Sequence, residues 1–292
     1  MQRTFATPGH VVAVVENAAG AVDIACQAVT TTEVILDASS PAGLERIEQA
    51  VVECTPSADG QLVSVRVPYQ HGRARFRRCD VRVRIVVPLR SDVDVSTASA
   101  PIAVRGLTGH ATFKTASGAI VADDAEGIVR AKSASGDIAL GSIDGEVRAQ
   151  SVAGDVHVTR ATRRLSVSTI SGRIGVDAAD DELEARTTSG RIVLGALRGD
   201  ASASTVSGGV TIAALRRGRL QIRTVSGDVT VGIAEKVTLR VDVDSVSGRV
   251  RSEIPITDQP SADEAAPIVS VAGRTVSGDV TLQRAAEPAL AE

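Results

Sequence analysis

The sequence predicts an all-β protein: a β-solenoid or β-helix-like stack of two-strand coils of about 18 residues, with one short helix near the N-terminus. Three observations support this prediction. A Ser-Gly pair recurs at a fixed step, apolar residues alternate with polar ones on both sides of each pair, and the 292 residues include one Tyr, three Phe and no Trp.

The recurring pair sets the length of each coil. Its first members are separated by a step of 18 residues, with Ala153 taking the serine position once, and later members follow at steps of 19, 21 and 30. A fixed period of this size is typical of a repeat architecture. The serines concerned are Ser117, Ser135, Ser171, Ser189, Ser207, Ser226, Ser247 and Ser277.

Period-two alternation predicts a strand on each side of the pair. Before Ser135, the residues Val129, Ala131 and Ser133 are apolar or small, whereas Arg130 and Lys132 lie between them. This pattern is typical of a strand with one buried face. After the glycine the alternation restarts in every coil, and the column that it predicts contains Ile120, Ile138, Val156, Ile174, Ile192 and Val210.

The glycines of the pairs are predicted to be structural corner residues, because glycine reaches positive φ without a Cβ clash. A second polar turn in several coils also carries a glycine, at Gly109, Gly127, Gly145 and Gly199. The predicted corner residues are Gly118, Gly136, Gly154, Gly172, Gly190, Gly208, Gly227, Gly248 and Gly278.

Stacking is favoured over an antiparallel meander closed into a sandwich or barrel, which remains the alternative topology. One unit cannot bury its apolar face alone, whereas stacked units form a continuous core. A thin interior also suits Ala, Val, Ile and Thr better than aromatic side chains. The scarcity of aromatic residues therefore fits the stack.

The array also extends toward the N-terminus. Residues 12–24 and 93–104 match the repeat, and residues 40–53 predict a short helix with Ser40 as its cap, Pro41 in its first turn and Leu44, Ile47 and Val51 on one face. Two strands are expected near 61–68 and 79–88, and an exposed loop at 257–267. We expect an N-terminal β-rich segment (1–92) that packs on the solenoid, the Ser-Gly solenoid (93–285) and a frayed tail (286–292).

Composition limits the possible partners and location. The net charge of −3 gives no electrostatic reason to expect nucleic acid or an anionic membrane. Cys26, Cys54 and Cys79 are odd in number and widely spaced, which favours free, buried thiols in a reducing compartment. The sequence shows no signal peptide and no transmembrane segment, so a cytoplasmic location is expected, with the cell envelope as the alternative if the start site is mis-assigned.

Several stretches resemble a known family. They are "VENAAGAVDI", "VRVRIVVPLRSDVDVSTASA" and the copies "TASGAI", "SASGDI", "TISGRI" and "TVSGDV", which together span about residues 10–285. The chain resembles the bacterial putative-adhesin β-strand-repeat family, a domain of unknown function. The resemblance implies a repetitive β fold and offers no catalytic residues.

Candidate metal and catalytic residues are better explained as structural. The serines lack a G-x-S-x-G context, and equivalent copies cannot all be nucleophiles. Asp137, Asp155, Asp228 and Asp279 suggest calcium, but Arg173 and Arg191 take the same position in other coils, so solvated turns are favoured. The histidines lack the spacing of a metal site, and we expect no metal and no cofactor. They are His10, His71, His110 and His157.

Two alternative functions have a sequence basis. Glu182 and Asp200 would share a column one coil apart, as the two carboxylates of a polysaccharide-active β-helix enzyme could, although Glu146 and Arg164 continue that column as a charge ladder. A basic strip could serve a nucleic-acid or envelope accessory protein, although it also fits an outer strand face. The strip contains Arg73, Arg75, Arg77, Arg78, Arg82 and Arg84.

The function favoured by the sequence is non-catalytic. We expect a scaffold that presents a repetitive surface for binding an unknown protein or polymer, or for self-association through the ends of the solenoid.

Overall fold

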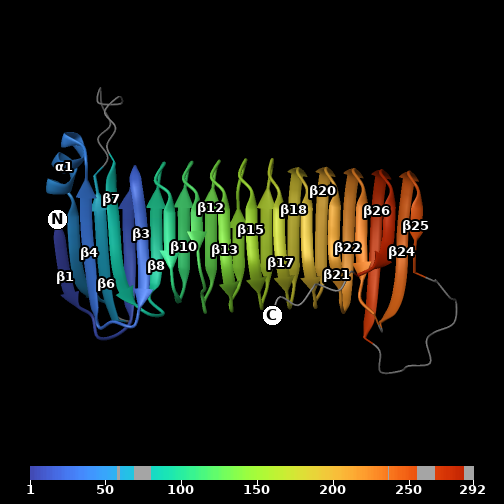
Figure 1. Ribbon diagram of the computed structural model, residues 1–292, viewed down its shortest axis with the longest axis horizontal. Helices are drawn as coiled ribbons and strands as arrows, with labels where there is room; N and C mark the ends of the chain where they lie inside the picture. The colour runs from blue at the N-terminus through green and yellow to red at the C-terminus, as the bar shows by residue number, and fades with distance from the viewer. Residues whose placement is uncertain (58–59, 69–79, 236, 255–266, 286–292) are drawn as a thin grey trace. The chain divides into compact units, whose positions relative to one another are not determined.

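A computed structural model describes residues 1–57, 60–68, 80–235, 237–254 and 267–285. The chain divides into two compact units, Met1–Gly154 and Asp155–Glu292. Each unit contains strands of two sheets, here called sheet A and sheet B, and α1 (Pro41–Glu48) belongs to the first unit (Figure 1). The expected boundary between residues 92 and 93 stays a prediction, and the tail 286–292 lies outside the described residues.

In the first unit each sheet has seven strands. Sheet A has the order β1 (Gln2–Ala6), β4 (Thr31–Ala38), β7 (Val81–Pro88), β3 (Gly20–Gln27), β9 (Ile102–Arg105), β11 (Ile120–Ala122), β13 (Ile138–Ile143). Sheet B has the order β5 (Val51–Ser57), β6 (Gly60–Val67), β2 (Val11–Asn17), β8 (Asp92–Thr97), β10 (Ala111–Thr115), β12 (Val129–Ser133), β14 (Val147–Gln150).

The second unit repeats this two-sheet arrangement. Its sheet A has the order β15 (Val156–Ala161), β17 (Ile174–Ala179), β19 (Ile192–Leu197), β21 (Val210–Leu215), β23 (Val229–Ile233), β27 (Val280–Arg284), β25 (Val250–Ser252). Its sheet B has the order β16 (Leu165–Thr169), β18 (Leu183–Ser189), β20 (Ala201–Ser207), β22 (Gly218–Ser226), β26 (Ile268–Ser277), β24 (Thr238–Ser247).

The predicted columns are present. In the first unit Ile120 pairs with Ile138, and in the second Ile174 pairs with Ile192, both in parallel and without a register shift. Equivalent residues of successive coils therefore lie next to one another, which confirms the solenoid-like stack and makes the antiparallel meander wrong. Antiparallel pairing among the described strands is confined to β1 with β4, β4 with β7, and β5 with β6.

The core is thin and aliphatic. Inward residues such as Ile138, Val156 and Leu194 are at most 1% exposed, while their neighbours along each strand face solvent. Phe113 has the largest side chain among the fully buried residues that the structure describes. Burial of β-branched and leucine side chains on both sheets supplies the main stabilisation, at about 25 cal/mol for each Å² of apolar surface removed from water.

The helix is shorter than the sequence predicts. Ser40 caps it as expected, since its hydroxyl accepts a hydrogen bond from the N–H of Gly43 and Pro41 occupies the first turn. However, the helix ends at Glu48, so Val51 opens β5 and is exposed, and Leu44 also faces solvent. The buried residues of α1 are Gly43 and Ile47. The predicted apolar face was wrong because strand pairing with β6 takes Val51 out of the helix.

Coil order departs from chain order in both units. In the first unit the earliest coil, β2 and β3, lies between the coil of β6 and β7 and the coil of β8 and β9. In the second unit the last coil, β26 and β27, lies between the coil of β22 and β23 and the coil of β24 and β25 (Figure 1). The strands predicted near 61–68 and 79–88 are confirmed over the described residues, whereas their positions in the stack were not predicted. The loop expected at 257–267 lies outside the described residues except for Pro267.

The inserted coil leaves a small apolar cavity. Gly273 of β26 occupies an inward position, between Ile222 of β22 and Val243 of β24. A Cβ at Gly273 would lie 3.4 Å from the nearest atom, a γ carbon of Val243, which is ordinary van der Waals contact. The φ of Gly273 is also outside the left-handed region. The site can therefore accept a methyl group.

We predict that Gly273→Ala stabilises the protein by about 1 kcal/mol, because the methyl group fills apolar space and lowers the entropy of the unfolded chain. Thermal and urea unfolding followed by circular dichroism would measure the change. Gly232→Ala is the matched control in the same unit, since its Cβ would lie 2.0 Å from the carbonyl oxygen of Ala213 and should destabilise. A destabilised Gly273→Ala protein would contradict the packing described for β26.

Candidate functional site

The glycines of the Ser-Gly pairs lie close to the backbone of a neighbouring coil. A Cβ added to Gly136 would lie 1.8 Å from the carbonyl oxygen of Gly118, and one added to Gly208 would lie 1.9 Å from that of Gly190. No real Cβ tolerates such a distance from backbone. Similar contacts of 2.0 to 2.2 Å to the residue of the adjoining coil occur at Gly118, Gly154, Gly190, Gly227, Gly248 and Gly278.

Positive φ explains only some of these glycines. Gly208, Gly227 and Gly278 have φ values of +151°, +143° and +148°. The φ of Gly136 lies outside the left-handed region, as does the φ of the four second-turn glycines that were expected to be positive. The expectation of positive φ is wrong for the second-turn glycines. A side chain is excluded there by the backbone of a neighbouring coil, as at Gly145, whose Cβ would lie 2.0 Å from the carbonyl oxygen of Gly127.

Buried hydroxyls complete the corners in the first unit. The Ser133 Oγ accepts a hydrogen bond of 2.7 Å from the N–H of Gly136, and the Ser151 Oγ accepts one of 2.9 Å from that of Gly154. In such local bonds a hydroxyl oxygen accepts from the backbone N–H three residues later. This N–H would otherwise need an acceptor on a neighbouring strand. The inward Ser of these coils is therefore part of the turn.

From Gly190 onward, the corners of the second unit are built differently. There the N–H of Gly190 donates to the Ser207 carbonyl at 3.0 Å, and that of Gly208 donates to the Ser226 carbonyl at 2.9 Å. There the sheet B strands extend as far as the serine, as β18 and β20 do, and the inward threonine hydroxyls do not bind the glycine amides. Within the described ranges, the buried hydroxyls without a hydrogen-bond partner are those of Thr187, Thr205, Thr224 and Thr275.

The aspartates after the glycines bind backbone amides. The Asp155 carboxylate accepts from the N–H of Arg173 at 2.7 Å, that of Asp228 from Asp279 at 3.0 Å, and that of Asp279 from Arg249 at 2.9 Å. Each bond ties one coil to an adjacent one. In the part of the chain that the structure describes, no group of three or more His, Cys, Asp or Glu residues is placed to hold a metal ion.

The two carboxylates considered for glycan cleavage are engaged in other contacts. Glu182 lies 3.4 Å from the Arg164 guanidinium, and the Asp200 carboxylate accepts from the N–H of Arg219 at 2.8 Å. Neighbouring charges are also paired, since Asp180 contacts both Arg160 and Arg198. The carboxylates of this column are therefore bound by arginine side chains or backbone amides of neighbouring coils.

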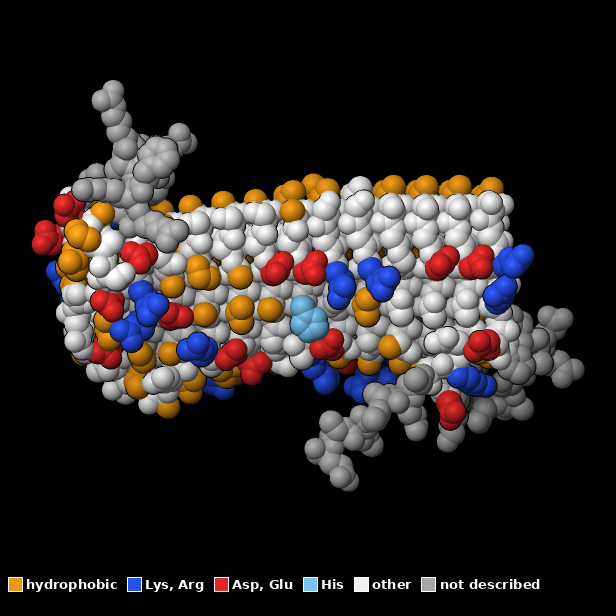
Figure 2. Space-filling view, turned by 45° about the horizontal axis from the view of Figure 1, so that its top comes forward, with side chains coloured by type: hydrophobic (Ala, Val, Ile, Leu, Met, Phe, Trp, Pro, Cys, Tyr) orange, Lys and Arg blue, Asp and Glu red, His pale blue; other side chains and the backbone are white. Residues whose placement is uncertain are grey.

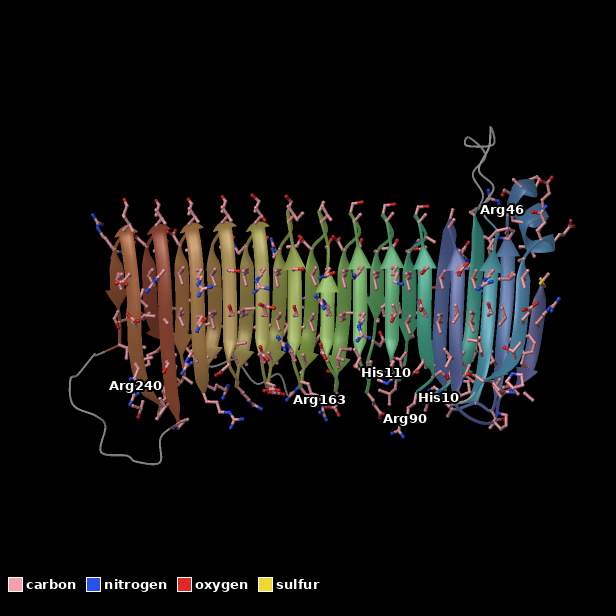
Figure 3. The ribbon with its side chains drawn as sticks, turned by 180° about the vertical axis from the view of Figure 1, so that it is seen from behind. His10, Arg46, Arg90, His110, Arg163 and Arg240 are labelled. Carbon is pink, nitrogen blue, oxygen red and sulfur yellow. The ribbon has the colours of Figure 1, made fainter. Side chains whose placement is uncertain are left out.

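The histidines and cysteines are dispersed. Figure 3 labels His10 and His110, which bind separate partners: His10 lies 3.5 Å from Asp92, and the His110 Nδ1 accepts from the N–H of Ile128 at 2.8 Å (Figure 3). In the second unit His157 lies 3.3 Å from Asp177. His71 lies outside the described residues.

Cys26 and Cys54 are free thiols, as predicted; Cys26 is buried and Cys54 is half-buried. Burial raises the pKa of the Cys26 thiol to about 11, which keeps that thiol neutral at physiological pH. Cys79 lies outside the described residues.

Only part of the basic strip is described. Arg82 and Arg84 lie on the exposed face of β7, and Arg84 lies 4.0 Å from Asp37 of β4. Arg73, Arg75, Arg77 and Arg78 lie outside the described residues. The described arginines therefore fit the outer strand face that the alternation predicts.

A row of exposed apolar side chains follows one edge of the second unit, at the ends of the sheet B strands (Figure 2). We name it the valine ridge. It is formed by the residues directly before the Ser-Gly serines, and strand pairing places them side by side with one polar member, Thr188. Its apolar members are Ile170, Val206, Val225, Val276 and Val246.

The exposure of the valine ridge is unusual. Val206, Val225 and Val276 are 50, 48 and 49% exposed, and Val246 is 82% exposed. Single exposed apolar residues are ordinary, but a contiguous row on consecutive coils is typical of an interaction surface. The ridge was not predicted, because its members lie at corners, outside the period-two alternation of the strands. The available signal was the recurring apolar residue in "TISG", "TVSG" and "SVSG".

The family of the chain follows from comparison with known proteins. The sequence matches the family described as Toastrack DUF4097 over residues 15–196 and 146–283. The chain belongs to this family. The predicted resemblance to a bacterial putative-adhesin repeat family is thereby confirmed, and the stacked coils above are the form that the Toastrack fold takes here.

Solved structures resemble this Toastrack chain at low identity. A putative adhesin from Bacteroides fragilis is 11% identical, with 96% of each chain covered and a TM-score of 0.37. A putative adhesin from Parabacteroides distasonis is 11% identical, covering 97% of this chain and 96% of that one, with a TM-score of 0.31. A putative cell adhesion protein from Clostridium sporogenes is 7% identical, covering 97 and 99%, with a TM-score of 0.25.

No curated protein matches the sequence. Among the described residues of this Toastrack protein, no helix has both the length and the apolar character that crossing a bilayer requires.

We predict that Gly136→Ala destabilises the protein by about 1 to 3 kcal/mol, because the added Cβ would force the Gly118 carbonyl of the adjoining coil to move. Gly9→Ala is the matched control, since no atom lies within 4 Å of its Cβ position. Urea unfolding would measure both variants. Equal stability of the two would contradict the close approach at the corner.

A second pair of variants separates the two kinds of corner. Ser133→Ala should cost about 1 to 3 kcal/mol, because the buried N–H of Gly136 loses its acceptor. Thr205→Val should be neutral or slightly stabilising, because it removes a buried hydroxyl that binds nothing among the described residues. Thermal melts of both variants test this difference, and a larger loss for Thr205→Val would reverse the assignment of the corners.

Proposed function

We propose that the chain is a non-catalytic repeat protein that uses the valine ridge as a repetitive surface for binding a protein or an uncharged polymer. The observation that carries the proposal is the row of half-exposed Ile and Val side chains on consecutive coils of the second unit. We further propose that the nine glycines of the Ser-Gly pairs are structural corner residues that hold this row in place.

The chemistry of the ridge supports an uncharged partner. Each apolar member is followed by an exposed serine, from Ser171 to Ser277. The surface therefore has a column of methyl groups beside a parallel column of hydroxyl groups. Neighbouring coils place these groups about 4.8 Å apart. A partner with its own regular spacing of apolar groups, such as the side of another β-structure, could cover several coils at once.

Nucleic acid and anionic polymers are disfavoured as partners. The ridge members and the serines that follow them carry no charge, whereas phosphate recognition depends on Lys and Arg. Several charges of the sheet faces are paired with one another, as at Arg164 with Glu182 and Arg160 with Asp180. Adhesin-like or scaffold character is compatible with such a surface, and a cytoplasmic location remains part of the proposal.

The test is capture from the native lysate by three forms of the immobilised full-length protein. The ridge variant combines Val206→Ser, Val225→Ser and Val276→Ser, all at exposed positions that should not affect folding. The control removes exposed apolar side chains elsewhere, by Val121→Ser and Val193→Ser. A parallel arm uses an array of neutral polysaccharides, and separation of cytosol from envelope locates the protein.

We expect one dominant partner on the wild-type and control proteins, with capture by the ridge variant reduced at least roughly ten-fold, since buried interface valines contribute on the order of 1 kcal/mol each. Quantitative mass spectrometry or array signal provides the measurement. Capture that is unchanged by the ridge variant would refute the proposed surface.

A further inference from the structure

The second unit has an open edge. β24 is the last strand of sheet B and pairs only with β26 among the described strands. Figure 3 labels Arg240 on this strand (Figure 3). β24 is ten residues long and contains no proline or glycine to interrupt pairing. A long regular edge strand of this kind can accept a further strand.

The interior is also open at this edge. Val250 of β25 is 46% exposed, whereas Val280, its neighbour one coil inward, is 3% exposed. Likewise Val241 of β24 is half-buried, whereas its neighbour Val271 is 2% exposed. These side chains point toward the core side of the stack. They are exposed because no described coil covers them at this edge. A partner at this edge would bury them.

The backbone of β24 is oriented for pairing. The N–H of Thr238 donates to the Pro267 carbonyl at 3.0 Å, on the side of β26. Amide and carbonyl groups of alternate residues point to the same side of a strand. Leu239, Val241 and Val243 therefore direct their N–H and C=O groups to the open side, where no described strand accepts them.

We propose that β24 pairs antiparallel with β24 of a second copy of this chain, about a two-fold axis at Val241. This pairing assigns the self-association of the stack to one edge and so deepens the proposed function. It rests on the proposal that the chain is a non-catalytic scaffold. Val241 faces Val241 of the partner subunit in a hydrogen-bonded pair, and Leu239 faces Val243 of the partner subunit. Three such pairs supply two backbone hydrogen bonds each.

The outward residues determine the register. With the axis at Val241, Arg240 lies directly opposite Asp242 of the partner subunit, and the symmetry repeats this ion pair. Both are exposed residues on the outer face of β24. They occupy non-hydrogen-bonded positions, where side chains of antiparallel strands are closest. Opposite charges at such positions stabilise the pair, and like charges destabilise it.

Neighbouring registers are less favourable. A shift of the axis to Arg240 places two arginines opposite each other. A shift to Asp242 sets Arg240 against Asp244 of the partner subunit but also places two aspartates opposite each other. An axis at Val243 sets Asp242 against Asp244 of the partner subunit. Registers that mix odd with even positions would place apolar inward residues opposite charged outward ones. The sequence of β24 therefore favours one pairing with itself.

The test is sedimentation equilibrium of the full chain across a wide range of concentration, with charge variants at β24. Wild type should form a dimer. Arg240→Asp should weaken dimerisation by at least roughly ten-fold, because Asp would face Asp242 of the partner subunit, and Asp242→Arg should do the same. The double variant Arg240→Asp with Asp242→Arg should restore the dimer, since the ion pair is re-formed with its signs exchanged.

Arg223→Asp is the control, because Arg223 is exposed on β22, away from the edge, and should leave the dimer unchanged. A monomeric wild type, single variants that dimerise like wild type, or a double variant that stays monomeric would each overturn the inference. So would capture of a different protein at β24 in place of a second copy. The ridge variant should dimerise normally, so loss of ridge binding and loss of β24 pairing are separate failures.

Discussion

The whole structure depends on how closely one coil can lie on the next at the Ser-Gly corner. Parallel strands need about 4.8 Å between neighbours, and at the corner the backbone turns while that spacing is kept. The carbonyl of one coil then occupies the volume in which the next residue would place its Cβ, as between Gly118 and Gly136. Glycine is required by this contact at Gly136 and at Gly208, although φ is positive only at Gly208. The fixed corner in turn keeps Ile120 beside Ile138 and the aliphatic columns in register.

The sequence was a good guide wherever one coil resembles another. Period-two alternation and the step of 18 predicted the columns, the strands and the aliphatic core, because each repeat experiences the same surroundings and encodes them locally. The cap at Ser40 was also predictable, since its bond to the Gly43 amide is local. The error at Val51 has a different origin: strand pairing with Arg66 overrides a helical pattern, and that partner lies 15 residues away in the sequence.

Coil order and the candidate surface could not be obtained in the same way. The parallel partners of β26 are β22 and β24, yet nothing in the pattern of residues 268–284 distinguishes an inserted coil from a terminal one. The small apolar cavity beside Gly273 lies at this inserted coil. The valine ridge was present in the sequence as an apolar residue before each serine. The residue could be recognised as part of a surface only once it was known to face outward. The period-two alternation stops at the corner and therefore does not predict the direction of this side chain.

The two units treat their outer edges differently. In the first unit, sheet B ends in β5, which pairs antiparallel with β6, contains Pro56, and has its Val52 carbonyl bound by the Arg3 guanidinium at 2.9 Å. These features are typical of an edge protected from further pairing. In the second unit the edge strand β24 has alternating Arg240, Asp242 and Asp244 instead. Charges on an edge strand oppose indiscriminate pairing, because most registers bring like charges together. The same charges favour the antiparallel register in which arginine meets aspartate and no like charges face each other, so an edge that resists aggregation can still select a copy of itself.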